Sequence, residues 1–206
     1  MNPNFTIRPY QPGDERSWLQ CRVLAFLETA YFDNVLREKE SYSSPAIELV
    51  AMYADTVIGL LDIECETEPN TICSVATNPG LAGMIWHIAV HPDYRSQGIG
   101  QALLDEAKGL ALDRGIKRFE AWTRDDEFVN DWYGKQGFAL IEHYYHVYPN
   151  VEEIQRTGIV TTTEEDSYAV SAYCHYLGND KQFLAQFARV HECRRYDLSL
   201  ESGTPA

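Results

Sequence analysis

The sequence predicts an α/β fold, in which strands and helices alternate along one chain. Short apolar stretches of strand length alternate with segments whose apolar residues recur at helical spacing. Residues that favour turns, mainly Gly, Pro, Asn and Asp, separate these segments. The 206 residues, 45% hydrophobic and 23% charged, are typical of a globular protein. We therefore expect a single domain over residues 1–206.

The N-terminal part is predicted to contain a strand at Phe5–Arg8 and a helix that Asp14 can cap. Two further strands are predicted at Ile47–Ala54 and Val57–Glu64, joined by a tight turn. The apolar residues at helical spacing are Leu19, Val23, Phe26, Leu27 and Ala30. A turn-rich loop, Glu66–Gly83, follows. It is longer than an ordinary hairpin connection, which suggests a binding role.

The middle of the chain is predicted to run strand, helix, strand, helix, strand. The five elements are expected at Met84–Val90, Gly100–Arg114, Arg118–Thr123, about Asp126–Gln136 and Phe138–Tyr148. Glycines follow both helical patterns directly, as is typical where helices end. This alternation is what places helices against the faces of a sheet.

The last part of the chain, residues 149–206, holds three further predicted elements. Tyr168–Leu177 and Glu192–Leu200 are strand-like, and Asp180–Val190 has the pattern of an amphipathic helix. We expect one of the two strands to be the last strand of the main sheet. The remainder is predicted to be an elaboration of the core.

Composition limits the partners and the compartment of the protein. The formal net charge of −14 argues against a nucleic-acid partner, which calls for a basic surface. The N-terminus has no apolar signal-peptide region, and no run approaches 18 apolar residues, so we expect no membrane segment. Five scattered cysteines without a CxxC pair favour reduced thiols and a cytoplasmic location.

The most informative stretch joins the strand Met84–Val90 to the helix that follows it. The joining loop contains Arg95-Ser96-Gln97-Gly98-Ile99-Gly100, and the helical pattern begins at once. Two glycines let backbone N–H groups turn inward, and the first helical turn adds unpaired donors. This layout suits a phosphate or pyrophosphate. Leu103 occupies the third glycine position of a dinucleotide fingerprint, and no P-loop is present.

The Arg-x-x-Gly-x-Gly pattern after Ala89-Val90 resembles the acyl-CoA binding motif of the GCN5-related N-acetyltransferase (GNAT) family. A Tyr-x-x-x-Gly-Phe element at residues 133–138 lies at the family's distance. The resemblance covers about residues 5–148. It implies a mixed, splayed sheet of about seven strands flanked by helices, with extra C-terminal elements. It also implies acetyl transfer from acetyl-CoA to a primary amine by direct attack.

The resemblance further implies which residues contact acetyl-CoA. Backbone N–H groups from Gln97 to Gln101 would hold the pyrophosphate, and Arg95 would add charge. Main-chain groups of Ile88–Val90 would meet the pantetheine arm, with an N–H near Val90 facing the thioester oxygen. The full expected set is Ile88, Ala89, Val90, Arg95, Ser96, Gln97, Gly98, Ile99, Gly100, Gln101 and Tyr133. No metal is expected.

By the same resemblance, Tyr133 is the general acid that protonates the departing thiolate. The general base is open. Met84 and Trp86 stand at the positions that face the substrate in the family, and neither is a base. Strand alternation turns His87 to the other face unless a bulge intervenes. Glu64 on the preceding strand is the first candidate, and a chain of water molecules is the second.

The acceptor is expected to be a small-molecule amine, with Trp86 and Arg124 as candidate contacts. Arg124 could pair with a substrate carboxylate or be an ordinary surface arginine. The aromatic cluster Tyr144, Tyr145 and Tyr148 could line the acceptor cleft, form the contact of a homodimer, or simply pack in a sheet. Two alternatives remain: a protein or peptide N-acetyltransferase, and a non-catalytic sensor that binds acyl-CoA.

Overall fold

The computed structural model describes residues 4–76, 80–162 and 167–201. Its eight strands form one sheet in the order β1-β2-β3-β4-β5-β8-β6-β7, and only the β4–β5 pair is parallel. The strands are β1 (Thr6–Pro9), β2 (Ala46–Tyr53), β3 (Thr56–Cys65), β4 (Leu81–Val90), β5 (Ile116–Thr123), β6 (Ala139–Val147), β7 (Cys174–Tyr176) and β8 (Val190–Ser199). The expected mixed sheet is confirmed. The short β7, paired to the outer end of β6, is the strand beyond the expected seven.

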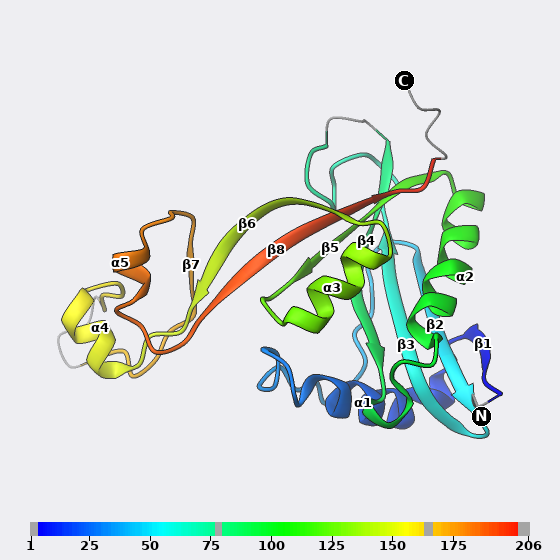
Figure 1. Cartoon of the computed structure of the whole chain (residues 1–206), viewed down its shortest axis with the longest axis horizontal. Helices are drawn as coiled ribbons and strands as arrows, with labels where there is room; N and C mark the ends of the chain where they lie inside the picture. Colours follow the sequence, from blue (N-terminus) through cyan, green and yellow to red (C-terminus); the bar gives the residue numbers. More distant parts are fainter. Residues whose placement is uncertain (1–3, 77–79, 163–166, 202–206) are drawn as a thin grey trace.

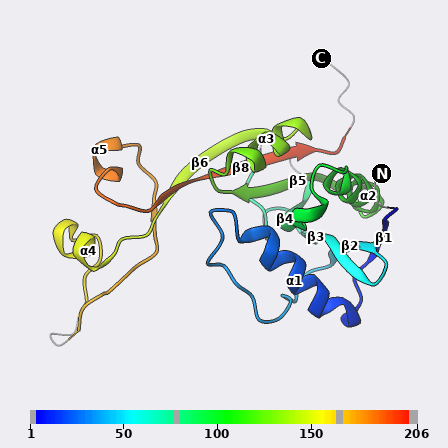
Figure 2. The same cartoon turned by 60° about the horizontal axis from the view of Figure 1, so that its bottom comes forward.

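Helices cover both faces of this sheet (Figures 1 and 2). The covering helices are α1 (Glu15–Phe26), α2 (Ile99–Asp113) and α3 (Glu127–Lys135), whereas α4 (Val151–Thr157) and α5 (Lys181–Leu184) lie away from the centre of the sheet. Helix α1 packs through Trp18, Cys21 and Ala25 against the face that carries Leu60 and Ala89. Helix α2 packs on the opposite face, so the centre of the sheet is shielded from water on both sides.

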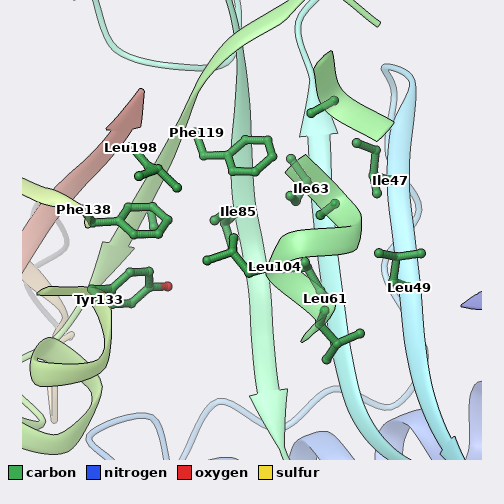
Figure 3. Packing of buried hydrophobic residues seen from close by; sticks show 14 of the residues in the cluster. Ile47, Leu49, Leu61, Ile63, Ile85, Leu104, Phe119, Tyr133, Phe138 and Leu198 are labelled. Carbon is green, nitrogen blue, oxygen red and sulfur yellow. The ribbon is translucent and has the colours of Figure 1, made fainter. Parts of the chain in front are cut away.

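The face under α2 and α3 is the main apolar core (Figure 3). Alternate residues of β2, β3, β4 and β5 point into it, as period-two patterning requires. The fully or nearly fully buried members drawn in Figure 3 include Ile47, Leu49, Leu61, Ile63, Ile85, Leu104 and Phe119. Gly59 lets the start of α2 pack closely on β3, because a Cβ at this position would lie only 2.7 Å from Cγ2 of Ile99. The helix N-terminus is thereby set close above the sheet.

Strands β4 and β5 separate halfway along β4. Their pairing ends at Ile85 and Ala121, and no strand of the described chain continues the ladder on that side of residues 86–90. On the other side, Asp62 pairs with His87 and Ile63 with Ile85, so Trp86 is an extra residue without a partner in β3. This β-bulge bends the strand and changes which side chains share a face.

The described residues between β6 and β8, 148–162 and 167–189, form an arm that projects from the rest of the molecule (Figure 1). It contains α4, β7 and α5. The expected last strand is β8. The expected strand Tyr168–Leu177 is reduced to β7, and the expected helix Asp180–Val190 is wrong beyond the four residues of α5. By Val190 the chain is already back in the sheet, where this residue pairs with Val147.

The other predicted elements agree with the structure to within a few residues. The helix expected at about Asp126–Gln136 is α3, and the strand expected at Phe138–Tyr148 is β6. The strand β4 begins at Leu81, inside the expected loop Glu66–Gly83. Residues 77–79 of that loop lie outside the described residues.

Candidate active site

The loop between β4 and α2 has the geometry of an anion cradle. Ser96 has φ of 60° and Gly98 has φ of 81°, both in the left-handed region. The first hydrogen bond of α2 runs from the Ala102 N–H to the Gly98 carbonyl at 2.9 Å. The N–H groups of residues 99–101 therefore have no acceptor within the helix, and Gly98 has no side chain that could cap them. Backbone donors and the positive helix end converge at one place.

Side chains of the cradle fasten it to α1 and α3. The Arg95 guanidinium donates to the Ala25 carbonyl at 2.8 Å and lies 3.4 Å from a Glu28 carboxylate oxygen. A Cβ on Gly100 would lie 3.5 Å from the Trp132 indole, so α3 packs closely on the first turn of α2. The residues present thus fit an anionic group through their backbone, while Arg95 also binds the C-terminal end of α1.

Tyr133 lies on α3, and its hydroxyl points toward β4 (Figure 3). Its ring is 4% exposed, stacks on Tyr196 with centroids 5.2 Å apart, and meets the edge of Phe138. Burial raises the pKa of the Tyr133 phenol above its ordinary value, so the hydroxyl stays protonated at neutral pH. A protonated hydroxyl near the open edge of β4 can act as a proton donor.

Asn130 positions the aromatic stack, although the sequence did not single it out. Its side-chain N–H groups donate to the carbonyls of Arg124 and Asp126 at 2.7 and 2.8 Å. Its Oδ1 accepts the hydroxyl of Tyr196 at 2.9 Å, which holds the ring beneath Tyr133. No sequence signal identifies this link, because Tyr196 comes 66 residues later on β8.

Glu64 is buried on β3, and both of its carboxylate oxygens already accept hydrogen bonds. One oxygen accepts from the Ser43 N–H, the Ser43 hydroxyl and the Ser44 N–H at 3.0–3.2 Å. The other accepts the indole N–H of Trp86 at 2.9 Å. The carboxylate therefore ties the segment before β2 to the sheet and fixes the orientation of Trp86.

The bulge at Trp86 turns His87 to the sheet face that α1 covers. The sequence analysis had left open whether such a bulge exists. Its ring meets Trp18 edge-on at 5.5 Å and is 6% exposed. Nε2 is hydrogen-bonded to the Glu40 carboxylate, and Nδ1 accepts weakly from Arg22 Nε at 3.5 Å. Both ring nitrogens are thus used within the protein.

The two candidate acceptor contacts lie in different surroundings. Trp86 is 49% exposed at the bulge, whereas Arg124 is 6% exposed. The Arg124 guanidinium donates to the Ala30 carbonyl, to the Tyr148 hydroxyl and, at 3.2 Å, to His146 Nδ1. Arg124 therefore joins the segment after α1 to the base of the arm. It is not the surface arginine that one sequence-based interpretation considered.

The described residues contain no group of three or more His, Cys, Asp or Glu side chains arranged to hold a metal ion. Within the same residues, no helix is both long enough and apolar enough to cross a membrane.

Comparison with known proteins places this geometry in a family. Residues 13–138 match the model of the acetyltransferase (GNAT) family, so the chain belongs to the GNAT acetyltransferases. It is an acyltransferase of the class that acetylates amino groups with acetyl-CoA as cosubstrate. The sequence matches no protein in a comparison with curated proteins.

Solved structures agree with this fold at low sequence identity. NAA60 from Arabidopsis thaliana, in complex with a bisubstrate analogue, is 12% identical, with a TM-score of 0.59 over 95% of this chain and 98% of that one. The ribosomal-protein-S18-alanine N-acetyltransferase of Escherichia coli is 14% identical, with a TM-score of 0.53 over 98% of each chain. An acetyl-CoA-bound GNAT acetyltransferase from Elizabethkingia anophelis is 16% identical, with a TM-score of 0.50 over 95% and 98%.

Proposed function

We propose that the protein transfers the acetyl group of acetyl-CoA to the primary amino group of a small molecule. The observation that carries the proposal is that buried carboxylates fasten two loops to the sheet, one of them Glu64, which also orients Trp86. Glu64 holds residues 43 and 44 by three hydrogen bonds. Glu66 accepts the N–H groups of Ile72, Cys73 and Ala82 at 2.9–3.1 Å. Loops that are held in one position before any ligand binds favour a preformed site, and we take a preformed site to favour a small acceptor over a long chain.

In this proposal the cradle of residues 95–101 binds the pyrophosphate of acetyl-CoA. The unpaired N–H groups at the start of α2 supply the hydrogen bonds, and the helix dipole favours the negative charge. The open edge of β4, Ile88–Val90, offers main-chain groups to the pantetheine arm. An N–H near Val90 faces the position where negative charge develops on the acetyl oxygen.

Tyr133 donates a proton to the departing thiolate in this proposal. The buried phenol keeps its proton at neutral pH, because burial raises its pKa. A thiol has a pKa of about 8.5, so a proton donor at the sulfur gives a moderate benefit, roughly 10²-fold or more. The stack on Tyr196 holds the ring in place for this step.

The amine must lose a proton before or during its attack. The four hydrogen bonds to Glu64 favour a positioning role for this carboxylate, and the pairing of His87 with Glu40 and Arg22 leaves that ring without a free nitrogen. Of the two routes expected from the sequence, we therefore propose that the proton leaves through water. A Glu64→Gln variant should keep the same pH profile of kcat as the wild type. Loss of the lower limb of that profile would instead identify Glu64 as the base.

The test is release of free thiol from acetyl-CoA with a panel of amines, wild type beside Tyr133→Phe. The Tyr133 hydroxyl donates no hydrogen bond within the described residues, so the variant should fold normally. We expect acceptor-dependent release that falls at least tenfold in Tyr133→Phe and is unchanged in the exposed control Tyr53→Phe. Equal rates in wild type and Tyr133→Phe would exclude the acid role.

The same panel separates the alternative functions. Short peptides in the panel test a protein acceptor, because the similar Escherichia coli structure is described as a ribosomal-protein-S18-alanine N-acetyltransferase. Tight binding of acetyl-CoA, measured by calorimetry, with no transfer to any amine or peptide would favour a non-catalytic sensor.

A further inference from the structure

Two tryptophans mark the point where β4 and β5 separate. Ile85 and Ala121 form the last pair of the parallel ladder, and Trp86 and Trp122 are the next residues on their strands. Both indole N–H groups reach carboxylates on the sheet face away from α2. One tryptophan therefore stands on each strand at the opening where the acceptor must approach.

Each tryptophan is held in one orientation by a buried glutamate. The Trp86 indole N–H donates to Glu64 at 2.9 Å, and the Trp122 indole N–H donates to Glu120 at 2.9 Å. Glu64 is 7% exposed and Glu120 is fully buried. A hydrogen bond to a carboxylate is stronger than a neutral one, so both indoles are oriented before any ligand binds.

The ring of Trp86 is open to a ligand. It is 49% exposed, and it makes no ring contact with another aromatic side chain of the described residues. A large apolar side chain that is both exposed and held in place is typical of a binding surface, because its ordering is complete before binding. On the other strand, Trp122 meets the edge of Tyr144 at 5.3 Å, and Tyr144 lies 4.8 Å from His175.

We infer that the acceptor is a primary amine carried on a flat aromatic skeleton, which stacks on Trp86 and is bounded by Trp122. This inference rests on the proposed function and names its substrate class. Indole faces bind flat rings by offset stacking, and they attract an ammonium group through cation–π interaction. Trp86 and Trp122 are thus specificity-determining residues.

The carboxylates beside the tryptophans argue against a polycationic acceptor. Both oxygens of Glu64 are occupied as described above. Glu120 accepts from the Ser74 N–H and hydroxyl, from Arg118 and from Trp122, at 2.8–2.9 Å. A polyamine would need carboxylates that are free to bind its further charges. These two carboxylates are already used within the protein.

The test compares matched acceptors and matched variants. We expect 2-phenylethylamine to be acetylated with a kcat/KM at least fivefold above that of 2-cyclohexylethylamine, which has similar size but no flat ring. Spermidine and a short peptide should be poorer still. Trp86→Ala should lower kcat/KM for 2-phenylethylamine at least tenfold and leave the KM for acetyl-CoA within twofold. Trp86→Phe should retain most of the activity.

The control is Leu112→Ala. Leu112 is 48% exposed and lies on α2, which packs on the sheet face opposite to the Trp86 indole. Calorimetry of 2-phenylethylamine binding to the protein with coenzyme A gives a readout that needs no turnover. Weaker binding in Trp86→Ala than in Leu112→Ala supports the inference. Equal binding in both variants, or a preference for spermidine or the peptide, overturns it. If another amine is acetylated, the proposed function survives that result. If acetyl-CoA binds and nothing is acetylated, both fall.

Discussion

The two faces of the central sheet are built from different chemistry at β5. On β5, the neighbours Phe119 and Glu120 are both fully buried and point to opposite faces. Phe119 belongs to the apolar core under α2. Glu120 lies among Arg118, Arg195 and Ser74 on the other face. The comparison shows that the face under α2 is held by apolar packing, while the other face combines apolar packing against α1 with carboxylates that hold loops in place.

The polar face binds loops through carboxylates at alternate positions, two on β3 and one directly after its end. Asp62 binds Lys39 at 2.8 Å, Glu64 binds residues 43 and 44, and Glu66 binds residues 72, 73 and 82. Each carboxylate fastens a loop that has no regular secondary structure of its own. A buried carboxylate is tolerated only where donors satisfy it, so each loop has one defined position.

The largest effect is expected from the apolar face. Phe119→Ala should lower the free energy of unfolding by about 4 kcal/mol, because it removes a fully buried ring and leaves a cavity. Urea denaturation measures this loss. The loss of unfolding free energy should be the same at low and high salt. A loss below about 1 kcal/mol would mean that the surrounding side chains fill the cavity.

The polar face should give a slightly smaller but context-dependent loss. Glu120→Gln should cost about 3 kcal/mol, because Arg118 and Arg195 both lose their ion pair with this fully buried carboxylate and keep only more exposed partners such as Asp197. The double variant Glu120→Gln with Arg118→Met should lose less than the sum of the two single variants, since no unpaired charge remains. Additive losses would show that this pair does not act as a unit.

The base of the arm should make stability depend on pH. Burial lowers the pKa of His146 to about 4, with help from the nearby Arg124 charge. The unfolded chain binds a proton near pH 6.5 and the folded chain resists it, so stability should fall as the pH drops from about 6.5 toward 4. We expect a loss of about 2 kcal/mol by pH 5 in urea denaturation. His146→Phe should lose less over that range. A parallel pH dependence would assign the effect to other groups.

The smallest effect is expected outside both faces. In Gly98→Ala the added Cβ would meet no atom within 4 Å, so the substitution adds only the backbone strain of a Cβ at φ of 81°. The cost should be about 1 kcal/mol in unfolding free energy. If the cradle binds pyrophosphate, the KM for acetyl-CoA should rise more than the stability changes. An unchanged KM would separate this loop from cofactor binding.

Local patterns allowed much of the fold to be predicted. The period-two apolar residues of β2 to β5 and the helical spacing in α2 identify elements from neighbours in the chain alone. The glycine loop and the Tyr-x-x-x-Gly-Phe element likewise predicted the family, because backbone conformation and spacing are local properties. The end of the predicted helix before Val190 was not predictable, since no local pattern shows that Val190 pairs with Val147 in the sheet.

The site was predictable only in part, and the bulge at Trp86 shows why. Strict alternation in residues 84–90 would place His87 on the same face as Ile85, but one unpaired residue opposite Asp62 and Ile63 reverses the order. His87 therefore lies under α1 and pairs with Glu40. The sequence contains both partners, 47 residues apart, and no local pattern joins them.

By itself, the sequence determined the family, the order of the core elements and the backbone cradle of residues 95–101. These follow from short-range spacing, turn residues and apolar periodicity. Only the tertiary structure decided that Glu64 and Glu120 orient Trp86 and Trp122, that Arg124 is buried, and that the arm projects from the sheet. Those features depend on hydrogen bonds, ion pairs and strand pairings between distant residues, which form only when the chain is folded.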